Sequence, residues 1–153
     1  MFVPVIPTGP HHTTTRPCVF RVAPWIPVEP NKIGAAILGK LPLTPGPRAF
    51  KVPSTVVPVG AGGILMFAWA RLSGPNPLAY WHVGTRLADG TEDWFSLLVA
   101  GDGSAAAVCN SQAFWLPMPA DGKVVVSLHA TGPLSNCDGE VEIHGYYPGP
   151  ELS

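Results

Sequence analysis

The sequence contains little charge. Of 153 residues only 12% are charged, whereas soluble domains average roughly 25%. Nine Lys and Arg residues nearly balance ten Asp and Glu residues, and the formal net charge is −1. The chain has no basic block, although nucleic-acid-binding proteins normally carry clustered Lys and Arg. We therefore expect no nucleic-acid partner.

Long apolar runs and a targeting pattern are also missing. A membrane-spanning helix needs about 18 or more largely uninterrupted apolar residues, and no stretch of this length is present. Residues 1–7 lack the basic region and the continuous apolar region of a secretory signal. We expect no membrane span and synthesis in a cytosol.

Signatures of catalysis and of cofactor binding are absent from the sequence. Gly60-Ala-Gly-Gly is not followed by the Lys-Ser/Thr of a phosphate-binding loop. None of the serines that we considered as nucleophiles has a Gly-x-Ser-x-Gly context. We therefore predict no enzyme, no catalytic residue and no cofactor.

Metal ligands are sparse too. The pair His11-His12 has no third ligand nearby in the sequence, and three or four are normally needed. Asp89, Glu92 and Asp93 share a glycine-containing loop, for which a solvated turn is a better account than a calcium site. We expect no metal.

Cysteine is scarce and odd in number. The three cysteines, Cys18, Cys109 and Cys137, cannot all pair within the chain. Cys109 and Cys137 could meet across a sandwich, or both could be small buried apolar residues. The sequence leaves these alternatives open.

Proline is abundant, and twelve of the nineteen prolines lie within residues 1–60. This density disfavours helices and central strands, because proline removes a backbone donor and fixes φ. Asn31 to Lys40 is the only candidate for a helical turn. We interpret residues 1–47 as an extended arm with large apolar anchors that dock on a surface, either of its own domain or of another subunit. The anchors are Phe2, Ile6, Phe20, Trp25 and Ile26.

Strand signals follow in residues 48–153, separated by glycine-rich turns. About eight short strands with no helix to cover a sheet predict an all-β, antiparallel jelly-roll-like sandwich, with an immunoglobulin-like sandwich as the alternative. The expected strands are 49–52, 55–59, 63–72, 78–87, 93–100, 104–109, 123–130 and 140–147.

The last two strands give the clearest pattern. In 140–147, Val141, Ile143 and Tyr147 fall on one face, while Glu140, Glu142 and His144 fall on the other. This alternation is typical of a strand with one buried face. We expect these two strands to form an edge of the sandwich.

Aromatic residues often occur in adjacent pairs, so that one ring of each pair should face outward from a strand. Outward rings can stack on sugars or anchor a protein interface. Trp81, Trp94 and Tyr147 are our candidates for stacking on a ligand, and a host glycan is the ligand considered.

The segment Phe114-Trp-Leu-Pro-Met-Pro-Ala-Asp-Gly-Lys-Val-Val-Val-Ser-Leu, with Val141-Glu-Ile-His-Gly-Tyr-Tyr147 after it, resembles the end of single jelly-roll domains in virion proteins. The resemblance is to phage minor tail, fibre and head-decoration proteins. It implies a structural or attachment role without catalytic residues, and assembly that is commonly trimeric.

Together these observations predict a structural virion protein, such as a capsid decoration, minor capsid, tail or fibre component. Its partners would be other virion subunits, with a homo-oligomer expected and a trimer favoured. It would be made in the host cytoplasm and reside in the virion. The alternative is a carbohydrate-binding module or lectin-like domain that uses surface aromatics.

Overall fold

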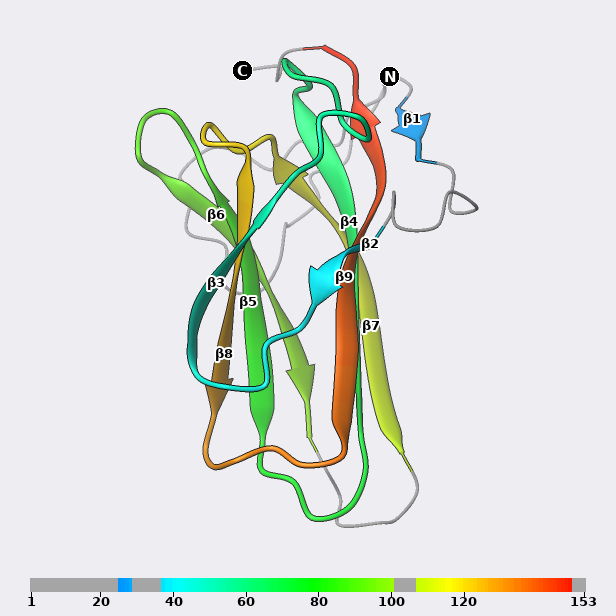
Figure 1. Ribbon diagram of the computed structural model, residues 1–153, viewed down its shortest axis with the longest axis vertical. Coiled ribbons are helices and arrows are strands. Elements are labelled where there is room, and N and C mark those ends of the chain that lie inside the picture. The colour runs from blue at the N-terminus through cyan, green and yellow to red at the C-terminus, as the bar shows by residue number, and fades with distance from the viewer. Residues whose placement is uncertain (1–24, 29–36, 101–106, 150–153) are drawn as a thin grey trace, which may run out of the picture.

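The computed structural model describes residues 25–28, 37–100 and 107–149, and all regular structure in these ranges is β. The strands of the described residues all pair antiparallel and form two sheets that face each other (Figure 1). The prediction of an all-β antiparallel sandwich is confirmed. The nine strands are β1 (Ile26–Pro27), β2 (Ile37–Lys40), β3 (Gly46–Lys51), β4 (Gly63–Leu72), β5 (Ala79–Arg86), β6 (Glu92–Val99), β7 (Val108–Pro117), β8 (Lys123–Ala130) and β9 (Cys137–Tyr147).

The strand pairing is nested along the chain. β2 pairs with β9, β3 with β8, β4 with β7, and β5 with β6. The first sheet has the order β1-β9-β4-β7, with β2 beside β1 on the same edge of β9, and the second has the order β3-β8-β5-β6. A long hairpin that pairs β2 with β9, β3 with β8, β4 with β7 and β5 with β6 across two sheets is the connectivity of a jelly roll, and β1 is added to the first sheet as a fifth strand.

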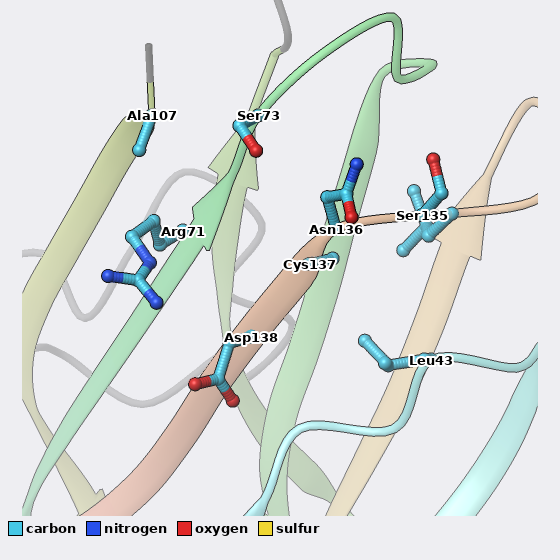
Figure 2. Close-up of a pocket in the computed structure, with 9 residues that line it drawn as sticks. Leu43, Arg71, Ser73, Ala107, Ser135, Asn136, Cys137 and Asp138 are labelled. Atoms are coloured by element: carbon cyan, nitrogen blue, oxygen red, sulfur yellow. The ribbon is translucent and has the colours of Figure 1, made fainter. Parts of the chain in front are cut away.

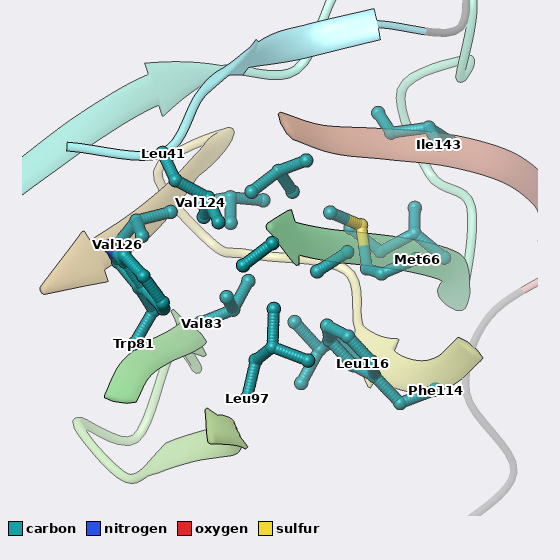
Figure 3. Packing of buried hydrophobic residues seen from close by; sticks show 14 of the residues in the cluster. Leu41, Met66, Trp81, Val83, Leu97, Phe114, Leu116, Val124, Val126 and Ile143 are labelled. Carbon is teal, nitrogen blue, oxygen red and sulfur yellow. The ribbon is translucent and has the colours of Figure 1, made fainter. Parts of the chain in front are cut away.

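Alternating apolar residues from both sheets fill the space between them (Figure 3). Burial in β5 alternates along the whole strand, which is what a period of two predicts for a strand with one face in the core. The large buried side chains include Trp81, Met66, Leu97, Leu116 and Ile143.

Prolines within strands lie where the sheet tolerates them. Pro27 is in β1, Pro47 is in β3, and Pro117 ends β7. All three strands are at sheet edges, where a missing N–H leaves no gap in a central ladder.

Two expected strands differ from the structure. Residues 55–59 form a turn, in which the amides of Val56 and Val57 both donate to the carbonyl of Pro53. This turn buries Val57 and leaves Val59 89% exposed, so its apolar content does not indicate a strand. Of the strand expected at 104–109, residues 104–106 lie outside the described residues, and residues 108 and 109 belong to β7, which continues to Pro117.

The candidate helical turn in Asn31 to Lys40 is wrong for its described part, because residues 37–40 form β2. Gly39 is required there by close packing: a Cβ at this position would meet the ring of Phe50. The glycine that weakened the helix prediction therefore serves a contact between strands of the two sheets.

The expected edge position of the last two strands is also wrong. β8 lies between β3 and β5 in the second sheet, and β9 lies between β4 and the pair β1 and β2 in the first. The face assignment in β9 is confirmed, since Val141, Ile143 and Tyr147 are buried. Both strands are central because each pairs on two sides. In the nested pairing, β8 joins the early strand β3 to β5, and β9 joins the early strands β1 and β2 to β4.

The described residues of the segment 1–47 lie on the sandwich. Ile26 pairs with Tyr146 and Ile37 with Glu142, so that both β1 and β2 extend the first sheet. The position proposed as the start of the sandwich, residue 48, falls inside β3. The anchors Phe2, Ile6 and Phe20 lie outside the described residues.

Candidate functional site

A depression of about 460 Å³ opens at one end of the first sheet (Figure 2). Its polar groups mostly hold loops together: the Ser73 amide donates to the Asn136 carbonyl at 3.2 Å, and the Ser135 amide donates to Asn76 Oδ1 at 2.9 Å. Asp138 Oδ1 accepts from Lys40 Nζ at 3.4 Å and from the Gly139 amide at 2.9 Å. These contacts give the depression a structural role in joining the loops before β5 and β9.

The outer face of the second sheet carries a more unusual arrangement, which we call the ring cluster: Tyr80, His82, Trp94 and His129. The Tyr80 and His129 rings stack at 4.9 Å between centroids and 10° between planes. His82 stacks on Trp94 at 4.2 Å and lies 4.7 Å from His129. Three adjacent strands, β5, β6 and β8, therefore bring two imidazoles between an indole and a phenol.

Gly84 makes room for this cluster. It lies opposite Trp94 in the register of β5 and β6, and a Cβ at Gly84 would be 2.8 Å from the Cβ of Trp94. Ser96, opposite His82, is only 9% exposed, and its Oγ has no hydrogen-bond partner. A buried hydroxyl without a partner is uncommon and calls for a physical explanation.

The outer face of the first sheet has an open groove of about 440 Å³ next to Phe67, Trp69 and Ser111. Trp69 in β4 lies between Ser111 of β7 and Glu140 of β9 in the strand register. Phe67 packs against His144 with 5.0 Å between ring centroids. We call this feature the aromatic groove, and it combines half-buried rings with a neighbouring carboxylate.

A third surface lies at the β1 edge of the same sheet. The Trp25 ring meets the Trp115 ring edge-on at 5.9 Å, and Trp115 stacks on Tyr147 at 4.6 Å. Trp25 and Ile26 are each 42% exposed. Two of the predicted arm anchors therefore lie on their own sandwich, with nearly half of each left open.

The structure separates the three residues predicted to stack on a ligand. Trp81 is fully buried, and its Nε1 donates to the Pro42 carbonyl at 2.8 Å, so it is part of the core and cannot stack on a surface ligand. Tyr147 is 7% exposed and stacks on Trp115. Only Trp94 lies at the surface, where it packs in the ring cluster.

The acidic residues Asp89, Glu92 and Asp93 do not form a common site. Asp89 Oδ1 accepts from the Thr91 amide at 2.9 Å, and Glu92 pairs with Arg86 at 2.7 Å, which raises the pKa of that guanidinium. Asp93 is buried on the opposite, inward face of β6, so the expectation that this residue is solvated is wrong. Within the described ranges, no group of three or more His, Cys, Asp and Glu residues is placed to hold a metal ion.

The two described cysteines, Cys109 and Cys137, have free thiols. They lie on opposite neighbours of β4, where Cys109 pairs in register with Arg71 and Cys137 with Leu72. Burial, followed by the charge of Asp138, raises the pKa of the Cys137 thiol. The sandwich therefore holds these cysteines apart.

Sequence reasoning missed the ring cluster and the aromatic groove as groups. No sequence motif links His82 with His129 or marks Phe67 and Trp69 as a group. Cross-strand register would have predicted the ring cluster, since Tyr80 lies opposite His129. That register depends on which strands are neighbours, which the sequence does not state.

Comparison with known proteins does not assign this chain to a family. No protein-family model matches the chain, and no curated protein matches it. Among solved structures, a chain in the "Structure of infectious bursal disease virus Gx strain" is similar, with a TM-score of 0.36 and 12% sequence identity. The similarity covers 99% of this chain and 39% of that chain. In the part of the chain that the structure describes, no helix is long and apolar enough to cross a membrane.

Proposed function

We propose that this chain is a structural subunit of a virion, either a capsid decoration or minor capsid protein or a tail or fibre component. The observation that supports this best is the jelly roll with its strand β1 at the edge of the first sheet, beside β9, where Trp25 and Ile26 remain 42% exposed. Jelly rolls are a frequent architecture of capsid domains, although lectins also use them.

Assembly would proceed by burial of apolar side chains against a neighbouring subunit. Complete burial of each anchor contributes about 1.5–3 kcal/mol. The many prolines restrict the free segment, so that less conformational entropy is lost when it orders on a partner. The proposal includes a homo-oligomer, with a trimer favoured as the resemblance to virion jelly-roll domains implies, and a structural rather than an enzymatic role.

Sedimentation of the purified full chain tests this proposal. We expect an oligomer for the full chain and a smaller species after replacement of Phe2, Ile6 and Phe20 by Ser. A matched control replaces Thr8, Thr13 and Thr14 by Ser in the same segment and should leave the oligomer intact. A monomeric full chain, or equal oligomers in both variants, would contradict the role of the anchors.

A lectin-like role is the second candidate, and the aromatic groove favours it. Sugar rings stack their C–H faces on aromatic side chains, and carboxylates accept hydrogen bonds from sugar hydroxyls. Trp69 lines this groove, and Glu140 is its register partner on the neighbouring strand β9, so that the two residues offer both kinds of group.

A glycan array followed by calorimetry with the best sugar tests the second candidate. We expect Trp69→Ala to abolish binding and Trp94→Ala, on the other sheet, to leave it unchanged. Loss of binding in Trp94→Ala alone would move the sugar site to the second sheet, and an array without any hit would reject the lectin role.

A further inference from the structure

Strand β7 forms an edge of the first sheet and, among the described residues, pairs with β4 alone (Figure 1). It is 10 residues long, whereas strands in globular proteins most often have about 5–6. Its pairing with β4 runs without a register shift, so no bulge interrupts it. From Val108 to Leu116 it contains neither a charged residue nor a proline. β7 therefore offers a long and regular edge to another strand.

The other described edge strands carry features that discourage such pairing. Natural sheets protect their edges with short strands, charged residues and proline. β1 has 2 residues, one of them a proline, and β2 has 4 residues and ends with a lysine. β3 contains a proline and two basic residues, and β6 begins with two acidic residues. The lack of any such feature in β7 indicates an edge that is used for pairing.

The backbone phase of β7 identifies the groups that face its open side. The amide of Met118 donates to the carbonyl of Gly62 at 3.2 Å, in the same register as the ladder between β7 and β4. In an antiparallel pair, residues that bond to the neighbouring strand alternate with residues that point away from it. The even-numbered residues of β7 therefore bond to β4. The backbone groups of four odd-numbered residues point outward, and we call these residues the open edge: Cys109, Ser111, Ala113 and Trp115.

Two further observations agree with this phase. Pro117 is also odd-numbered, so its missing N–H falls on the open side and takes no hydrogen bond from the ladder. Outside the ladder, the described part of the chain supplies no backbone hydrogen-bond partner to any residue of the open edge. The outward N–H and C=O groups are therefore available to a further strand.

The middle of β7 is exposed on both faces. Phe114 and Leu116 are buried and mark the inward face, to which Gln112 also belongs. Nevertheless Ser111, Gln112 and Ala113 are all exposed, although a strand between two layers should alternate. The second sheet thus leaves this part of β7 uncovered, and a strand from outside can reach the open edge.

We propose that the open edge pairs antiparallel with β7 of a second copy of this chain, so that the first sheets of the two copies become one continuous sheet. The two-fold axis passes through Gln112. Ser111 then lies opposite Ala113 of the second copy. Cys109 lies opposite Trp115 of the second copy. Every residue of the open edge thus meets another one, and each such pair can exchange two hydrogen bonds.

Two properties of β7 favour a second copy over a different protein. The strand carries no charge, so that self-pairing brings no like charges together and no charge selects a partner of opposite sign. The register also covers the aromatic groove, because Cys109 and Ser111 line this groove at the open edge. Trp115 and Ala113 of the second copy would lie beside them. The proposal does not depend on the virion role, since it concerns β7 and not the arm anchors.

Sedimentation equilibrium of the full-length chain tests the proposal. The reference protein carries Phe2→Ser, Ile6→Ser and Phe20→Ser, so that association through the arm anchors does not contribute. We expect a concentration-dependent dimer in the reference. Ala113→Lys should weaken this dimer at least about tenfold, because it places two like charges on one face of the joined sheet. Val125→Lys, at an exposed apolar position on the second sheet, is the matched control and should leave the dimer unchanged.

A disulfide provides a second readout, which reports the register. Gln112 faces its own copy in a pair without hydrogen bonds, where the Cα atoms are about 4.5 Å apart and a disulfide can form. In the reference with Cys18→Ser and Cys109→Ser, Gln112→Cys should give a covalent dimer in a glutathione buffer. Val59→Cys, at an exposed position in a turn, should not cross-link at the same protein concentration. A monomeric reference, an unchanged dimer with Ala113→Lys, or equal cross-linking at both positions would each overturn the proposal.

Discussion

The indole Nε1 of Trp81 donates a hydrogen bond to the carbonyl of Pro42, 2.8 Å away. This bond joins the centre of β5 to the connection between β2 and β3, and both residues are buried. A single core side chain thus ties the second sheet to the part of the chain that crosses from one sheet to the other.

We predict that Trp81→Phe destabilises the sandwich by about 2–4 kcal/mol. The buried Pro42 carbonyl would lose its donor, which costs about 1–3 kcal/mol, and the smaller ring would leave a void. Urea unfolding followed by circular dichroism measures this change. Trp69→Phe, on the outer face, is the control and should shift stability by less than about 1 kcal/mol. Equal effects of the two substitutions would refute the special role of the buried bond.

Gly145→Ala should displace β1 from the edge of β9. A Cβ at Gly145 would meet the Trp25 ring and lie 2.9 Å from the Ile26 carbonyl. The amide of Val28 donates to the backbone carbonyl of His144 at 2.8 Å, and its hydrogen should then exchange faster. Hydrogen exchange with mass spectrometry tests this, with Gly149→Ala as the control because no atom lies within 4 Å of its added Cβ. Unchanged protection of Val28 would show that β1 does not depend on this contact.

Val57 and Val59 should differ sharply in their contribution to stability. Val57 is 1% exposed and Val59 is 89% exposed, although both lie in one turn. We expect Val57→Ala to cost about 1–3 kcal/mol because apolar area leaves the core. Val59→Ala should change stability by less than about 0.5 kcal/mol. Thermal denaturation of both variants measures the two changes in stability. Similar losses of stability would mean that the turn does not bury Val57 and expose Val59.

The two described cysteines should react at different rates with a thiol reagent. Cys109 is exposed, whereas Cys137 is half-buried and its pKa is raised by burial and by Asp138. A raised pKa lowers the fraction of reactive thiolate at any pH below it. With Cys18→Ser as background, labelling at pH 7.5 should proceed first at Cys109, as mass spectrometry of the peptides would show. Faster reaction at Cys137 would contradict the burial of its thiol.

Local pattern predicted most of the strands because burial in this sandwich follows a period of two. Gly63–Leu72 and Lys123–Ala130 were predicted with the bounds that the structure has. The apolar pattern wrongly predicted a strand at 55–59. These residues form a turn, and Val57 is apolar because its side chain is buried in the core. The pattern also misplaced β7, because the strand was expected to end at Cys109.

The candidate sites were harder to predict than the strands. Trp81 and Trp94 have similar local sequence contexts, with an adjacent aromatic residue each, yet one is in the core and the other at the surface. Which ring faces inward depends on strand phase. Which rings then meet, as His82 and His129 do, depends on sheet order, and this order arises from contacts between distant parts of the chain.

The nested pairing also determines when the protein can become native during its synthesis. β9 is translated after the other described strands, yet it supplies the hydrogen-bonding partner of β1, β2 and one side of β4. Until residues 137–147 leave the ribosome, β4 therefore has an open ladder in the middle of a sheet. A ribosome that stalls before Cys137 would release a chain with an unpaired, apolar strand, which is a substrate for chaperones or for aggregation.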